Sequence, residues 1–210
     1  MDCSSSEGIR HGYRYAVRAF TELVAVIDDD AWGRPALGVW TVRDLVGHTS
    51  RALLTVDSYL DPTRTAEVPD LPDAAAYFRV AQSALADPVA VAERGRQAGA
   101  ALGDDPAATV ADLAERVLGR IEAAPDDALV STPVGTMTLA GYLPTRTFEL
   151  VVHGLDLAGA LGVDPPAALT EPIFCCLQLA ATLAGARPDA AQLLLALTGR
   201  QPLPTGFSVV

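Results

Sequence analysis

Apolar residues recur at steps of three and four positions in one segment of this chain after another. This spacing constrains the fold more than any other feature, because it is typical of helices that bury one face. The predicted helices span residues 8–29, 41–61, 74–101, 104–124, 139–161, 170–185 and 189–198. Only residues 131–137 look extended, and we expect a loop or a short strand there. Long amphipathic helices joined by modest loops predict an all-α helix bundle.

Local signals mark several helix ends. Thr41 can cap the second helix, with Asp44 three residues later in an approximate capping box. Asp87-Pro88 predicts a kink or a break within residues 74–101. A proline-rich loop is expected to follow the second helix, from residue 61 to residue 73.

The length of 210 residues suits one domain, and no internal repeat or low-complexity linker marks a second one. We expect a helix bundle over residues 1–165. A C-terminal helical extension over residues 166–210 is expected to pack on the same domain, and the chain to be a monomer or a homodimer.

Composition excludes several classes of function. The chain has 26 acidic and 15 basic residues, and a net charge of −11 disfavours nucleic acid and anionic membrane surfaces as partners. Every basic residue is arginine, so chemistry through a lysine Schiff base is excluded. The N-terminus lacks the apolar core of a signal peptide, and Glu171 and Gln178 interrupt the most apolar stretch. We therefore expect a soluble cytoplasmic protein.

Three cysteines and one histidine are given structural roles. Cys3 is terminal, and Cys175 and Cys176 point about 100° apart on a helix. Because of this placement, we expect no disulfide, and buried thiols at Cys175 and Cys176. His11 has no partner motif in the sequence and is expected to be a surface residue. Trp40 is expected to pack against the entry of the second helix.

Two histidines and a glutamate form the candidate site. His48 lies in the second predicted helix, and Glu149 and His153 lie one turn apart in residues 139–161. Two histidines and one carboxylate are the ligand set of an open catalytic metal site. Helix bundles assemble such sites from inward side chains on facing helices.

Arg146 and Asp156 extend the same stripe. With Glu149 and His153 they follow at steps of three, four and three, which places all four on one helix face.

Other interpretations remain open on the residues alone. The stripe could face water as an ordinary polar surface with exposed ion pairs, and His48 could be a hydrogen-bonded boundary residue. A non-catalytic metal- or ligand-binding bundle is the alternative to an enzyme. A non-haem iron enzyme is a third hypothesis, because this ligand set also suits Fe(II).

The segments at residues 40–48 and 149–158 resemble the DinB-like superfamily, and more closely the mycothiol-dependent maleylpyruvate isomerase family. The order of the motifs, their separation and the aspartate after the last histidine all fit. The resemblance covers roughly residues 8–165. Residues 193–200 and 206–209 are also similar to a short C-terminal segment of many members.

The resemblance implies a four-helix bundle with a divalent metal held by His48, Glu149 and His153. Zinc is the expected ion, with iron or nickel as alternatives. Arg146 and Asp156 would orient the ligands. The cosubstrate would be mycothiol, a low-molecular-weight thiol of actinobacteria, whose coordinated thiol would lose its proton at neutral pH. Such a nucleophile can be transferred to a small electrophilic substrate, or can add to an activated alkene and be expelled after bond rotation.

The chain departs from the full isomerase pattern at its C-terminus. The prototype isomerase has a further domain that supplies an arginine near the substrate. Arg187 and Arg200 are the only arginines after the second motif, and neither can be matched to that role. A mycothiol S-transferase, or an isomerase of another substrate, is at least as well supported as a maleylpyruvate isomerase.

Overall fold

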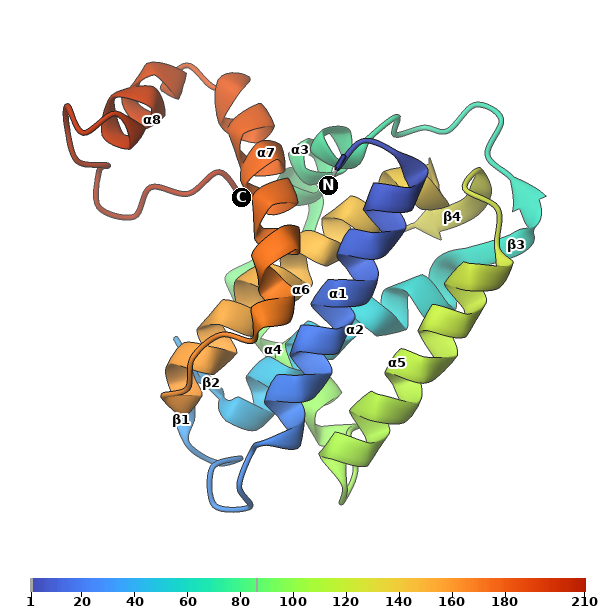
Figure 1. Cartoon of the computed structure of the whole chain (residues 1–210), viewed down its shortest axis with the longest axis vertical. Coiled ribbons are helices and arrows are strands. Elements are labelled where there is room, and N and C mark those ends of the chain that lie inside the picture. The colour runs from blue at the N-terminus through green and yellow to red at the C-terminus, as the bar shows by residue number, and fades with distance from the viewer. Residues whose placement is uncertain (1, 86) are drawn as a thin grey trace.

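The computed structural model describes residues 2–85 and 87–210, and these residues are mostly helical (Figure 1). The α-helices are α1 (Ser6–Ala25), α2 (Val42–Tyr59), α3 (Ala74–Leu85), α4 (Pro88–Ala100), α5 (Pro106–Ala123), α6 (Leu139–Leu161), α7 (Thr170–Gly185) and α8 (Ala190–Leu197). A short 3-10 helix, η1 (Ala167–Leu169), precedes α7. Each predicted helix is present, and the break expected at Asp87-Pro88 separates α3 from α4.

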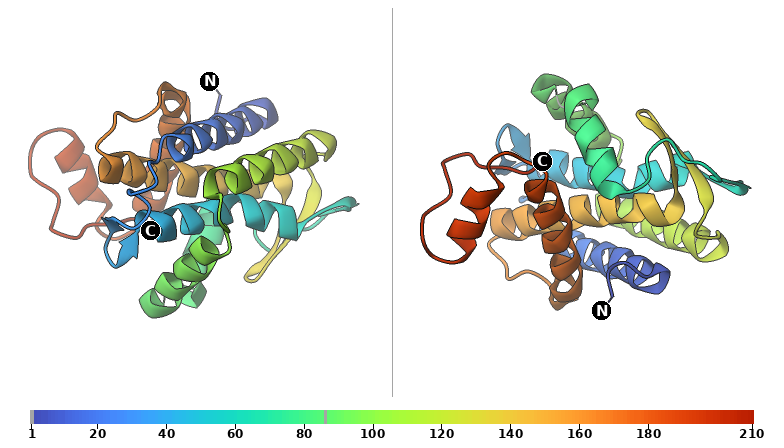
Figure 2. Two further views of the ribbon diagram at one scale, coloured as in Figure 1. Left: turned by 90° about the horizontal axis from the view of Figure 1, so that it is seen from below. Right: turned by 90° about the horizontal axis from the view of Figure 1, so that it is seen from above.

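Four helices, α1, α2, α5 and α6, form the bundle. α1 and α2 each contact both α5 and α6, and a further helix, α4, packs along α2 (Figures 1 and 2). Their inward side chains are fully buried, among them Tyr13, Phe20, Leu45, Leu53 and Leu150. Burying one side chain of this size contributes about 1.5–3 kcal/mol to the stability of the fold. The apolar periodicity of the sequence is therefore the periodicity of this core.

The prediction of an all-α fold is only approximately correct, because two small antiparallel sheets are present. β1 (Pro35–Leu37) pairs with β2 (Trp40–Thr41). β3 (Leu60–Thr65), β4 (Ala128–Thr132) and β5 (Gly135–Thr138) form the second sheet in that order.

The sequence predicted only part of the second sheet. β4 and β5 account for the extended stretch that was predicted. β3 lies where a proline-rich loop was expected, and Leu60 there pairs with Val130, far along the chain. β3 is an edge strand, which tolerates the missing N–H of Pro62. Local pattern could not reveal a pairing with so distant a partner.

The C-terminal part covers one side of α6. α7 contacts α6 and α1 through a short row of buried side chains, namely Pro172, Cys176, Leu183 and Ala184. α8 has no buried residue, and it stands away from the bundle at the end of α7 (Figure 1). By length and composition the stretch Ala167–Gly185 could cross a bilayer, contrary to the expectation from Glu171 and Gln178. In the structure, 28% of this stretch is buried.

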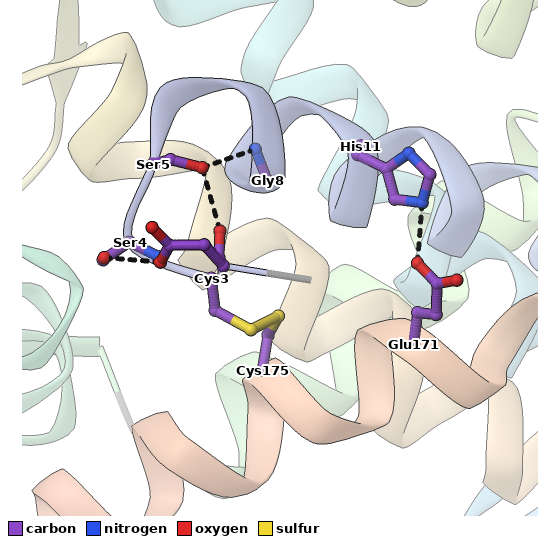
Figure 3. The surroundings of a disulfide bond; sticks show 8 residues. Cys3, Ser4, Ser5, Gly8, His11, Glu171 and Cys175 are labelled. Carbon is purple, nitrogen blue, oxygen red and sulfur yellow. Dashed lines mark hydrogen bonds and ion pairs between the residues drawn. A yellow bond between two sulfur atoms is a disulfide. The ribbon is translucent and has the colours of Figure 1, made fainter.

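The cysteine prediction is wrong for two of the three residues. Cys3 and Cys175 form a disulfide with a Cα–Cα distance of 5.5 Å (Figure 3). The turn before α1 lies against α7 and brings together residues 172 positions apart, which no spacing rule could show. Cys176 is a free, buried thiol, as expected.

The side chain of His11 is only partly exposed, and it has two partners. Its Nε2 atom lies 2.8 Å from Oε2 of Glu171, and its ring stacks on Tyr15. The ion pair joins α1 to α7 one helical turn before Cys175 (Figure 3).

Candidate metal centre

The polar stripe of α6 faces the interior of the protein. Arg146 is only 8% exposed, and Glu149, His153 and Asp156 are partly buried. Leu155, an apolar residue, is instead among the exposed ones. The reading of this stripe as an ordinary water-facing surface is therefore wrong, because α6 is contacted by α1, α2, α3 and α7.

Local features of α2 place His48 opposite this stripe. The predicted capping box is present, since the side chains of Thr41 and Asp44 each accept from the backbone N–H of the other. A Cβ atom on Gly47 would lie 2.1 Å from the backbone nitrogen of Gly99, so glycine is needed where α4 crosses α2. The residue after this close contact is His48.

Trp40 fixes the ring of His48 from the other side. Its indole N–H donates to the backbone oxygen of Ala92 at 3.0 Å. The Trp40 and His48 ring centroids are 4.5 Å apart. Trp40 thus packs at the helix entry as predicted, and it also forms a wall of the candidate site.

His48, Glu149 and His153 converge as the sequence predicts. Oε2 of Glu149 lies 3.9 Å from Nε2 of His48 and 3.5 Å from Nε2 of His153. One potential ligand atom from each residue lies within 4.8 Å of the others. Bond lengths of 2.0–2.2 Å to a tetrahedral ion place its ligands about 3.3–3.6 Å apart. The donor set therefore fits a divalent ion after a small inward movement.

The outer nitrogen atoms of the two histidines have different surroundings. Nδ1 of His153 lies 3.0 Å from Oδ2 of Asp156, which would leave Nε2 free as a ligand. Nδ1 of His48 is buried and has no hydrogen-bond partner within the described part of the chain. With Nε2 as its ligand atom, His48 therefore lacks the hydrogen-bond partner that usually holds the outer nitrogen of a metal-binding imidazole.

The electrostatics of the cluster separate the two histidines. Burial, together with the nearby His153, lowers the pKa of His48 to about 4. Burial also opposes protonation of His153, but hydrogen bonds with Asp156 and Glu149 outweigh it and raise the pKa of His153 to about 9.

Glu149 stays ionised in spite of its burial. Burial alone would raise its pKa, but the hydrogen bond from His153 and the charge of Arg146 lower that pKa to about 2. The metal-free cluster therefore has a neutral His48, an anionic Glu149 and a cationic His153 at neutral pH. A metal ion must displace the proton of His153.

Arg146 acts on this cluster through its charge. Its guanidinium lies over the rings of Tyr77 and Tyr142, at 5.3 and 5.1 Å from their centroids. Its Nε atom donates to Thr145 Oγ1 at 2.9 Å. These contacts hold a buried positive charge near Glu149.

A cavity of about 400 Å³ opens beside His48 and Glu149. Sequence reasoning did not identify its other lining residues, which include Arg51, Thr55, Tyr59, Tyr77, Phe78, Gln82, Arg94 and Val210. Arg51 and Thr55 could have been found, because they follow His48 at steps of three and four on α2. Val210 had no such signal, because only the fold brings the C-terminal tail to this cavity.

Comparison with known proteins identifies the family. The model of the mycothiol maleylpyruvate isomerase N-terminal domain matches residues 13–158, which include the whole candidate cluster. No curated protein and no solved structure gives a significant match. The matched region covers more than half of the chain, and it includes all of α2 and α5, α1 from residue 13 onward and α6 up to residue 158. The chain therefore belongs to the mycothiol maleylpyruvate isomerase N-terminal domain family.

Proposed function

We propose that this protein is a divalent-metal-dependent enzyme that activates a low-molecular-weight thiol, mycothiol. The thiol would be transferred to a small electrophilic substrate, or would catalyse its cis–trans isomerisation. The observation that carries the proposal is the convergence of His48, Glu149 and His153, of which His48 and Glu149 line a cavity. Family membership supports the choice of thiol.

The three residues would hold the ion through the two Nε2 atoms and a carboxylate oxygen of Glu149. Zinc is the expected ion, and iron or nickel suits the same donors. When bound, a divalent cation would lower the pKa of a thiol that coordinates it.

Neighbouring residues would prepare the ligands. Asp156 would hold the ring of His153 with Nε2 directed at the ion. The hydrogen bond with His153 and the charge of Arg146 together lower the pKa of Glu149 and keep it ionised. Trp40 excludes water from one face of His48.

The cavity supports a small-molecule reaction. Its volume of about 400 Å³ lies within the range of ordinary ligand pockets. Tyr59, Tyr77 and Phe78 supply aromatic walls, while Arg51 and Arg146 supply positive charge. These walls favour a compact substrate with an apolar body and an anionic group. We therefore propose that its partners are small molecules. We also propose that the protein is a DinB-like bundle located in the cytoplasm.

Calorimetric titration with mycothiol tests the proposal. Zinc-loaded protein is expected to bind one equivalent, and metal-free protein and the Glu149→Gln variant are expected to bind far less. Glu22→Gln, on the exposed face of α1, is the matched control and should bind like the parent. Equal binding with and without zinc, or none in either state, would contradict thiol activation. That result would favour a non-catalytic ligand-binding bundle.

A further inference from the structure

We propose that Cys3 and Cys175 form a site of reversible thiol–disulfide exchange with small-molecule thiols, with Cys3 carrying the mixed disulfide. The bond joins the turn before α1 to the middle of α7 (Figure 3). Neither residue belongs to the candidate metal centre. The proposal therefore stands on separate observations and can fail or succeed independently of the proposed function.

The disulfide is accessible to a small reagent. Cys3 and Cys175 are both only partly buried. They line a surface groove of about 530 Å³ that also includes Pro72, Gly141 and Gln178. An attacking thiolate must approach a sulfur along the S–S axis, which requires open space beside the bond. The groove provides space for a reagent of the size of a peptide thiol.

The turn that carries Cys3 is held by contacts other than the disulfide. The backbone N–H and the hydroxyl of Ser4 donate to Oδ1 of Asp2 at 2.9 and 2.7 Å. The hydroxyl of Ser5 donates to the backbone oxygen of Asp2 and accepts from the N–H of Gly8 at 3.1 Å (Figure 3). Because of these bonds, the turn keeps its shape when the disulfide opens.

α7 is held independently as well. The hydrogen bond between His11 and Glu171 joins it to α1 at 2.8 Å, one turn from Cys175. The buried side chains of Leu183 and Ala184 anchor its second half. After opening, the two sulfur atoms would remain neighbours at a high effective concentration, so the bond can form again.

The neighbouring thiol does not compete for the disulfide. Burial raises the pKa of Cys176 to about 12. Cys176 is free and buried. Since the thiolate is the nucleophile in exchange, Cys176 stays unreactive and an external thiol is required.

The exchange is balanced with two molecules of thiol. The first thiolate attacks Sγ of Cys3, its electron pair forms the new S–S bond, and the pair of the old bond leaves on Sγ of Cys175. That thiolate takes up the proton that the attacking thiol released to water. A second thiolate then attacks the small-molecule sulfur of the adduct and releases Cys3. In total, two thiols are oxidised to one disulfide, and Cys3–Cys175 is reduced by two electrons.

Cys3 is the better position for the adduct. It lies in a short turn at the edge of the groove, where added bulk displaces little. Both cysteines also line a smaller space with Gly8, Thr147 and Leu179, but Cys175 lies on α7 itself, the helix that packs on α6 and α1. An adduct there would push α7 away from α6 and α1.

The full-length protein can be tested with glutathione as the probe thiol. Protein is equilibrated in buffers of increasing reduced-to-oxidised glutathione ratio, quenched with acid and analysed by intact mass and peptide mapping. The disulfide form is expected to give way to the dithiol form, with a mixed disulfide on Cys3 in between. Cys175→Ser should carry one glutathionyl group on Cys3. Cys176→Ser is the matched control and should behave like the parent.

Circular dichroism should show unchanged helix content in the opened form, because α7 keeps its other contacts. A disulfide that persists in folded protein at all ratios and opens only in denaturant would overturn the proposal. So would an absence of adduct on Cys3 in Cys175→Ser when the Cys175→Ser protein is shown to be folded.

Discussion

Nδ1 of His153 lies 3.0 Å from Oδ2 of Asp156, one turn further along α6. A carboxylate in this position fixes the tautomer of a metal-binding imidazole, and losing it typically weakens metal binding about 10–100-fold. Asp156→Asn is therefore expected to lower zinc affinity by about that factor, measured by competition with a chromogenic chelator. Asp112→Asn, an exposed position on α5, is the control. Equal affinity in the two variants would show that Asp156 does not support the site.

The metal-free protein is expected to be most stable near pH 6.5 as far as its two buried histidines determine stability. The folded-state pKa of His48 is lowered to about 4, so the unfolded chain binds the extra proton between pH 4 and 6.5. Over that interval stability rises with pH. The folded-state pKa of His153 is raised to about 9, so its contribution is complete below pH 6.5 and is lost as the pH rises to 9.

Each side of this maximum corresponds to a free energy on the order of 3 kcal/mol, at about 1.4 kcal/mol per pKa unit. Urea unfolding of chelator-treated protein between pH 4 and pH 9 measures this free energy of unfolding. His153→Gln should lose the decline above pH 6.5 and keep part of the rise below it, because burial still lowers the pKa of His48. Persistence of the decline in that variant would assign it to other groups.

Arg146 is expected to stabilise the fold as well as the candidate site. Arg146→Leu removes its contacts with two tyrosine rings and the hydrogen bond to Thr145. Together these are worth about 2–3 kcal/mol in the free energy of unfolding. Chemical denaturation of Arg146→Leu beside Arg79→Leu, an exposed arginine of α3, measures the difference. A loss no larger in Arg146→Leu than in Arg79→Leu would contradict this role.

The C-terminal tail is expected to restrict access to the cavity. Val210 lines the cavity, and Gln82 donates to the backbone oxygen of Val209 at 3.0 Å. Arg187 donates to the backbone oxygen of Ser208 at 2.5 Å. Deleting residues 207–210 should therefore speed the extraction of bound zinc by a chelator several-fold. Within the described residues, the side chain of Arg200 donates a hydrogen bond only to the backbone oxygen of Thr198. Arg200→Ala should therefore leave the rate of zinc extraction unchanged.

The sequence was sufficient for features that depend on local pattern. Apolar spacing predicted each helix, and Thr41 with Asp44 predicted the start of α2. The stripe of α6 could be predicted because steps of three and four fix a helix face whatever lies opposite it. Its inward orientation followed only once α2 was known to pack against α6.

Features that depend on contacts between distant segments were not predictable. The β3–β4 pairing, the Cys3–Cys175 bond and the arrival of Val210 at the cavity each join residues far apart in the chain. No local propensity encodes such contacts, since they arise from the packing of whole elements. The unpaired Nδ1 of His48 is likewise a property of burial, which spacing alone does not give.

Metal content tests the central claim most directly. The parent protein and the His11→Ala control, whose histidine pairs with Glu171 away from the cluster, should each retain about one equivalent of zinc or another divalent ion per chain after gel filtration. His48→Ala and His153→Ala should retain almost none while keeping the helical circular dichroism spectrum. Equal metal content in all four proteins, whether full or absent, would contradict a metal centre formed by His48, Glu149 and His153.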